Sequence, residues 1–524
     1  MSIELVRDLF KLDQVVGENI TQAIVEGDIL VPDTKPDITR VLSANGKVVL
    51  TKQEVGDNKI AVEGITYFKI LYVSDKGEQP LYSIDSSTQF KQNIEIEGIG
   101  SKMKGEVIGD VEHIDFTVNN DRKIGVRAVI NLAGKAIEEK TLEITKDITG
   151  IEDIQVLKEN FQYTDIVGIN KSETLVKDNF EMSEDEYEIK EVLKWDATVQ
   201  ERETKITDGK VIVGGMVSID LLYVDDDYEN PLKMIKREIP FTHFVEISEA
   251  FSDMKYKLKL STKELYYAIK ENIRGEKKIV DIEAVIQVEA KVMDTQTREI
   301  LVDTYSPSKT LNINKKQIEL KENIGMNKAH VLLRETLDLP YGHPPISEVF
   351  SVNIKPILTD YSLIEDKVTI EGILEVLVMY RSIEEGQSLY SYIQESPFRH
   401  YVDLYGLQED MKAEVELFVE EINYNILNGE QLELKVNIGA TCEAYFTKVI
   451  DVISNIEELE EDLNLDKRSS LTIYFMQPED NLWKVAKKYH TTVQRIMETN
   501  QIEDPVAVKA GEHIIIEKVH SFKL

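Results

Sequence analysis

The sequence predicts a mainly β protein: three repeated antiparallel domains, each sandwich-like or barrel-like, followed by a small β-α-α-β domain. Three observations predict this fold. A set of glycine, tyrosine and phenylalanine markers returns three times in register, short runs of β-branched and aromatic residues alternate with turn residues, and the C-terminal segment changes to helical spacing. At 524 residues the chain is too long for one hydrophobic core, so several domains are expected.

The repeat rests on a glycine that stands eight residues before a tyrosine, which is followed eighteen residues later by a phenylalanine. The three sets are Gly64, Tyr72 and Phe90; Gly215, Tyr223 and Phe241; and Gly372, Tyr380 and Phe398. A second glycine precedes each tyrosine by fifty-five residues, at Gly17, Gly168 and Gly325. The offsets between successive copies are 151 and 157 residues, so each copy is long enough to be a domain rather than a solenoid unit.

Alternating apolar residues define strands inside each copy, for example at 126–132 and 432–438. We expect roughly eight strands per copy. The segments 11–19, 158–170 and 315–327 precede the copies, and each is either a connecting helix or an extended strap. The expected domains are 1–16 (N-terminal segment), 17–150, 151–312 and 313–452 (repeats), 453–468 (acidic linker) and 469–524 (C-terminal domain).

Helical spacing marks the C-terminal domain. Leu482, Val485, Ala486 and Tyr489 follow the i, i+3, i+4, i+7 pattern of one buried helix face, and Thr492 stands where the N-cap of a second helix belongs. A turn at 509–512 then leads into a last strand at 513–517. The acidic run 457–462 separates this domain from the repeats, so we expect residues 469–524 to fold and bind alone.

Charge and composition narrow the function classes. With 61 basic and 96 acidic residues the formal net charge is −35, which disfavours nucleic acid and anionic lipid as partners. The first fourteen residues carry several charges and are no signal peptide, and no long apolar run predicts a membrane span. The single cysteine, Cys442, reads as a buried strand residue. We expect a soluble cytosolic protein.

No motif for catalysis, nucleotide binding or metal binding occurs in the sequence. His330, His343 and His400 are scattered among unrelated strands, and the acidic triplet at 225–227 reads as a solvated hairpin loop. The repeated tyrosines and phenylalanines end or follow apolar strands, which favours packing over ligand binding. We therefore expect no enzyme activity, no cofactor and no metal.

Two resemblances add context. The triple register resembles the SPOCS domain of spore-coat scaffolds over about 17–150, 168–312 and 325–452, and the tail resembles a LysM domain, with its Leu482-Trp483 helix and Thr491-Thr492-Val493 second helix. LysM domains usually bind N-acetylglucosamine polymers, but the usual Gly-Asp-Thr is replaced here at 479–481 by Glu-Asp-Asn, which weakens that expectation.

The resemblance to SipL-type scaffolds implies a partner and a place. It implies that the LysM domain holds a SpoIVA-type coat morphogenetic ATPase, that other spore coat proteins are further partners, and that the protein lies in the mother-cell cytoplasm at the outer forespore surface and coat. The alternative is a LysM protein that binds peptidoglycan or cortex glycan.

Trp483 is the first candidate for the partner contact. If Leu482 belongs to the buried face, Trp483 is turned by about 100° onto a face with Lys487 and would be at least half exposed. A large aromatic beside a cation is a frequent interface anchor. Lys484, Leu471 and Tyr474 are weaker candidates for the same surface. The alternative is that Trp483 only packs against a neighbouring strand or loop.

Overall fold

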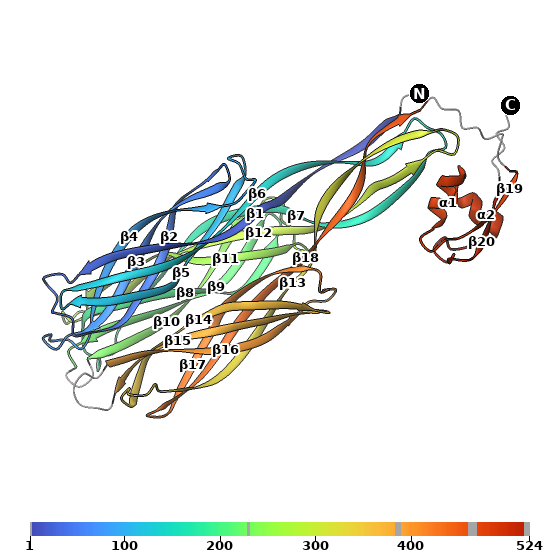
Figure 1. The fold of residues 1–524 in the computed structure, drawn as a ribbon. Helices are drawn as coiled ribbons and strands as arrows, with labels where there is room; N and C mark the ends of the chain where they lie inside the picture. The colour runs from blue at the N-terminus through green and yellow to red at the C-terminus, as the bar shows by residue number, and fades with distance from the viewer. Residues whose placement is uncertain (1–2, 228–230, 383–388, 460–468, 518–524) are drawn as a thin grey trace.

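The computed structural model describes residues 3–227, 231–382, 389–459 and 469–517. It confirms the mainly β fold class. The chain forms eighteen strands in three repeats and then a small domain with two helices (Figure 1).

Each repeat contains six strands rather than the expected eight, because several strands are much longer than a typical strand. In the first repeat they are β1 Glu4–Leu30, β2 Arg40–Gly56, β3 Lys59–Val73, β4 Tyr82–Glu95, β5 Lys104–Asn120 and β6 Lys123–Thr149. In the second they are β7 Gln155–Glu181, β8 Ile189–Thr207, β9 Lys210–Asp225, β10 Leu232–Glu246, β11 Lys255–Glu271 and β12 Lys277–Tyr305. In the third they are β13 Leu311–Asp338, β14 Ile346–Ile364, β15 Lys367–Ser382, β16 Leu389–Asp403, β17 Lys412–Asn428 and β18 Gln431–Glu458.

The repeats share one topology. Each has two antiparallel three-stranded sheets, ordered β1-β6-β5 and β2-β3-β4 in the first repeat, with the equivalent strands in the other two. The two sheets are separate in strand order, and one apolar core with residues from both lies between them, which makes a sandwich; their edge strands lie close together, β2 beside β5 and β1 beside β4. Tyr72, Tyr223 and Tyr380 lie near the ends of the equivalent central strands β3, β9 and β15, as the register predicts.

The repeat markers have a packing explanation. Gly64 lies directly across the ladder from Phe90, Gly215 from Phe241 and Gly372 from Phe398. The phenylalanine ring covers the glycine, so that a Cβ added at any of the three would come within 2.5–2.6 Å of the ring. The marker tyrosines are almost fully buried, and the hydroxyls of Tyr72 and Tyr380 donate to the carbonyl oxygens of Pro36 (2.9 Å) and Pro344 (3.0 Å).

The segments that precede the repeats are extended strands, not helices. They form the first halves of β1, β7 and β13, which pair along their length with β6, β12 and β18. A bulge interrupts each ladder beside Gly17, Gly168 or Gly325. Two residues further on, the amides of Asn19, Asn170 and Asn327 donate to backbone carbonyls of β4, β10 and β16 at 2.7–2.8 Å.

Beyond the sandwiches, these six strands twist together into a narrow stalk (Figure 1). Apolar side chains from all three repeats fill it: Ile144, Phe161, Tyr163, Ile300, Val302, Ile318, Ile450 and Val452. A second cluster, which includes Ile148, Leu301, Ile453 and Ile456, continues toward the tip. The expected boundaries at 16, 312 and 452 therefore fall inside β1, β13 and β18, because the flanking residues belong to the stalk.

At the opposite end, the base, the three sandwiches pack on one another. The buried contacts come from equivalent positions of the repeats: Leu42, Leu193 and Phe350; Leu71, Leu222 and Met379; and Leu81, Leu232 and Leu389. Ion pairs also join the repeats, including Lys135 with Glu414 at 3.0 Å, Lys328 with Glu201 at 3.0 Å and Lys355 with Asp110 at 2.8 Å. The repeats thus form a single body with approximate threefold symmetry.

Cys442 lies in the core of the third repeat, fully buried as expected, and burial raises the pKa of its thiol to about 12. Within the described ranges, no helix is long and apolar enough to cross a membrane.

Candidate functional site

The C-terminal domain has the predicted β-α-α-β order. Its elements are β19 Leu471–Phe475, α1 Leu482–Tyr489, α2 Val493–Asn500 and β20 His513–Glu517, and β19 pairs with β20 in antiparallel register. Its core contains Met476, Leu482, Val485, Ala486, Ile496, Ile514 and Ile516. The helical spacing correctly predicted the buried face of α1, although Tyr489 is only partly buried.

Side-chain caps and one asparagine fix this domain. The side chain of Asn481 accepts a hydrogen bond from the Lys484 amide at 2.8 Å, and that of Thr492, the predicted cap, accepts one from the Arg495 amide at 3.2 Å. Asn500 donates to the carbonyls of Ile496 (2.8 Å) and Ile515 (2.7 Å) and accepts from the Ile515 amide at 2.7 Å. This asparagine therefore ties α2 to β20.

The domain is docked on the end of β12, in the second repeat. Asp303 accepts hydrogen bonds from the indole Nε1 of Trp483 at 2.8 Å and from Lys487 Nζ at 2.6 Å. Two residues further along β12, Tyr305 joins the core of the C-terminal domain, and its hydroxyl donates to the carbonyl of Thr491 at 2.8 Å. The rings of Tyr305 and Trp483 meet edge to face, with centroids 4.9 Å apart.

At this dock, the negative charge of Asp303 lies beside two lysines. Burial alone would raise the pKa of Asp303, but the hydrogen bonds from Lys487 and Trp483 lower it more, so that its pKa lies below the usual value. Lys315 of β13 also lies 3.5 Å from the same carboxylate. The carboxylate therefore stays ionised at neutral pH between two cations.

The expectation that Trp483 is at least half exposed is wrong. Trp483 is only partly exposed, because a strand of the second repeat covers the face of α1 that the helix geometry turns away from the domain core. The strand that packs on it comes from about 180 residues earlier in the chain, so sequence reasoning within the domain could not reveal it.

The other predicted contact residues are divided between two faces. Lys487 lies with Trp483 at the dock, whereas Leu471 is exposed on β19. Lys484 donates through Nζ to the carbonyl of Glu479 at 2.8 Å. The hydroxyl of Tyr474 donates to Asp480 at 2.6 Å, and this hydrogen bond raises the pKa of Tyr474 to about 12. The structure thus does not gather the five residues into one patch.

Sequence reasoning missed an apolar face on β19. Leu471, Ile473 and Phe475 are 52%, 56% and 60% exposed, and they point to the same side of the strand because side chains alternate along it. Ile515 is the ladder partner of Ile473, and the ring of His513 lies 6.2 Å from that of Phe475. The sign of this face in the sequence is an apolar residue at every second position of the segment 471–475.

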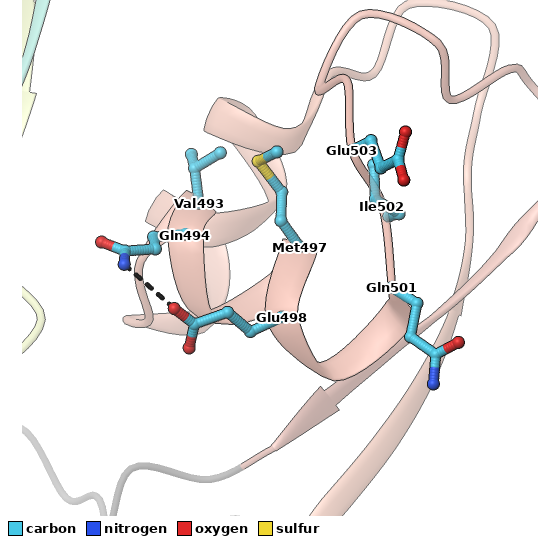
Figure 2. Close-up of a pocket in the computed structure, with 7 residues that line it drawn as sticks. All are labelled: Val493, Gln494, Met497, Glu498, Gln501, Ile502 and Glu503. Atoms are coloured by element: carbon cyan, nitrogen blue, oxygen red, sulfur yellow. Dashed lines mark hydrogen bonds between the residues drawn. The ribbon is translucent and has the colours of Figure 1, made fainter.

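Two shallow depressions lie at α2. The larger, of about 590 Å³, is lined by Val493, Gln494, Met497, Glu498, Gln501, Ile502 and Glu503 (Figure 2). In it, Gln494 donates to Glu498 at 2.9 Å. The neighbouring depression, of about 370 Å³, includes the structural Asn500. Among the described residues, no group of three or more His, Cys, Asp or Glu side chains could hold a metal ion.

The fold and this site define a class: a repeat scaffold of β-sandwiches that carries a small docked binding domain. Comparison with protein-family models gives the particular family. The model "SipL, SPOCS domain" matches residues 37–119, 188–270 and 345–427, and the LysM domain model matches 476–517. The chain has the SipL-like architecture of three SPOCS domains and a C-terminal LysM domain, both of which are non-catalytic families.

The matched segments begin shortly before β2, β8 and β14 and end within β5, β11 and β17. The long strands that build the stalk therefore lie outside them. No curated protein matches the chain. The crystal structure of the ferric yersiniabactin uptake receptor FyuA from Yersinia pestis matches at 10% identity over 85% of this chain and 75% of that chain, with a TM-score of 0.11.

Proposed function

We propose that this protein is a non-enzymatic scaffold of the spore coat, which binds a SpoIVA-type coat ATPase through its LysM domain. In this role it lies in the mother-cell cytoplasm and helps coat assembly at the outer forespore surface. Other coat proteins would bind to the base and sides of the repeats. The SipL-type architecture supports the sporulation context.

One observation carries the choice of a protein partner: the apolar face formed by Leu471, Ile473 and Phe475. Aliphatic and aromatic side chains exposed side by side on a two-stranded sheet favour contact with another protein. The partner strand β20 adds Ile515 to this face, as the ladder partner of Ile473. A sugar polymer would need a groove with several polar groups directed into it.

The loops that hold glycans in LysM domains offer little of this chemistry. In the first loop, the Asp480 carboxylate accepts hydrogen bonds from the Tyr474 hydroxyl and the Gln477 amide, so it is already engaged. In the loop after α2, Val506 is 86% exposed and apolar. These features weigh against the alternative of a peptidoglycan or cortex glycan-binding protein.

The test is Ile473→Asp in the full chain, compared with Val506→Ser. We expect Ile473→Asp to weaken ATPase binding by about tenfold or more, because a charge would be buried in the contact. Val506→Ser removes an even more exposed apolar side chain from the loop after α2 and should leave ATPase binding unchanged.

Insoluble peptidoglycan is assayed in parallel with the same two variants. Binding of the unaltered chain to peptidoglycan, with a loss for Val506→Ser and none for Ile473→Asp, would replace the proposed function by the glycan-binding one. Circular dichroism confirms that both variants retain the fold.

A further inference from the structure

The contact between the LysM domain and the stalk covers one face of α1. Tyr305 is only 5% exposed, and the side chain of Asp303 is 15% exposed, although both residues lie at the end of a strand. Trp483 and Lys487 each make a direct hydrogen bond to Asp303, and Tyr305 reaches the backbone between α1 and α2. A partner cannot contact the α1 face while these stalk residues occupy it.

The dock is specific to the second repeat. Ladder pairing sets the equivalence: Asp303 and Tyr305 pair with Leu157 and Gln155, and the corresponding residues of the first repeat, which pair with Val6 and Glu4, are Asp147 and Thr149. The first repeat keeps the carboxylate, which lies 3.2 Å from Lys158, but a threonine supplies no aromatic edge to meet Trp483. Of these two equivalent strand ends, only that of β12 carries the aromatic side chain of the dock.

The contact is also one that can open. It consists of hydrogen bonds, an ion pair and one inserted ring, not a continuous sheet or a long apolar seam. Twelve residues separate Glu458 from Leu471 in the sequence. A LysM domain released from the dock would therefore stay attached to the chain, and a tethered domain rebinds with a high effective concentration.

We propose that the tip of β12 is an autoinhibitory clamp, in which Asp303 and Tyr305 hold the α1 face of the LysM domain closed. This proposal rests on the proposed function and adds its regulation. In the closed state a partner reaches the apolar face of β19 but not the α1 face. Full binding, with Trp483 and Lys487 in the contact, requires release of the LysM domain from Asp303 and Tyr305. The observed affinity is therefore the affinity of the open state multiplied by the fraction of open molecules.

The first experiment measures the clamp without any partner. The chain has two tryptophans, so Trp195→Phe in the full-length protein leaves Trp483 as the only indole reporter. In this background, Asp303→Asn with Tyr305→Phe removes the ion pair and the hydroxyl bond and keeps the shape of both side chains. We expect at least a twofold increase in the quenching of Trp483 fluorescence by acrylamide.

The matched control is Asp147→Asn, which removes one negative charge at the equivalent position of the first repeat, where the carboxylate pairs with Lys158 and not with the LysM domain. It should leave quenching unchanged. A stronger variant, Asp303→Lys, places a cation against Lys487 and Lys315. Quenching that stays at the control level in both the Asp303/Tyr305 variant and Asp303→Lys overturns the clamp.

The second experiment measures binding of the SpoIVA-type ATPase to the same full-length proteins. Opening should strengthen binding by about tenfold, with Asp147→Asn at the level of the unaltered chain. Increased quenching with unchanged or weaker binding overturns autoinhibition, because the dock would then orient the domain for its partner. If neither the closed nor the opened chain binds the ATPase, the proposed function itself fails, and this regulation with it.

Discussion

A methyl group added at Gly215 tests whether the glycine and phenylalanine markers are a packing device. The new Cβ would lie 2.5 Å from two ring atoms of Phe241 and 2.8 Å from the carbonyl oxygen of Gln200. The ring is buried, and the carbonyl belongs to the backbone of the paired strand β8, so neither can move without cost. Overpacking of this kind costs about 1–3 kcal/mol, and we expect Gly215→Ala to fall in that range.

Gly214 is the matched control, because it is the next residue on the same strand and faces the other side. There a new Cβ would meet its nearest atom, the carbonyl oxygen of Glu203, at 3.4 Å, which is ordinary contact. We expect Gly214→Ala to change the free energy of unfolding by less than about 1 kcal/mol, or to raise it slightly by restricting the unfolded chain.

The chain has too many packed units for a two-state analysis. The assay is therefore calorimetry of the full protein, with amide hydrogen exchange of peptides from β9 and β10 as the local readout. A loss of 1 kcal/mol lowers the melting temperature of a unit of this size by about 2–4 °C. Gly64→Ala and Gly372→Ala should repeat the result in the other copies, and equal stability of the Gly214 and Gly215 variants would refute the packing explanation.

Three further predictions follow from the stalk and the LysM domain. Because the pKa of Asp303 is lowered, its contribution to docking should be complete above the ordinary carboxyl pKa near 4 and lost as the pH falls through the lowered value. A pH series of Trp483 quenching measures this contribution, and a loss already near neutral pH would contradict the prediction. Phe161→Ala should cost about 3–5 kcal/mol and speed amide exchange at the stalk ends of β7 and β12, with the base unaffected. The excised domain 469–524 should fold but melt at a lower temperature than in the chain, because Tyr305 is missing from its core; melting at an equal temperature by circular dichroism would contradict this.

Much of the repeat could be predicted from the sequence, because its markers are local consequences of strand pairing. Gly64 and Phe90 are direct ladder partners, and the same offset in each copy therefore indicates the same hairpin. The β-α-α-β order of the C-terminal domain could also be predicted, because helix caps and helical spacing are encoded within a few residues. The count of strands was not, because Gly17 and Asn19 lie in the middle of the 27-residue strand β1, where they mark a bulge and not the turn that such residues usually indicate.

The packing between repeats was hidden for a different reason. Alternation predicts that one face of a strand is buried, but it does not say what covers the other. The end of β3, residues 70–73, is four apolar residues in a row, all buried, and this loss of alternation is the one sequence sign that Leu71 packs against another repeat. At the LysM domain, Asp303 and Tyr305 are ordinary strand residues in sequence, so the cover on Trp483 could come only from the folded chain.

The long strands give this molecule two ends that serve different purposes. β12 alone runs 29 residues from the base to the dock, which at about 3.3 Å per residue is a distance of roughly 95 Å. Each described strand end in the stalk lies at the same pole as the LysM domain, whereas the hairpins of the base lie at the other (Figure 1). In the proposed function, a protein held by the docked LysM domain and one held at the base would be separated by about this length, so the docked scaffold would act as a spacer between two layers of an assembly.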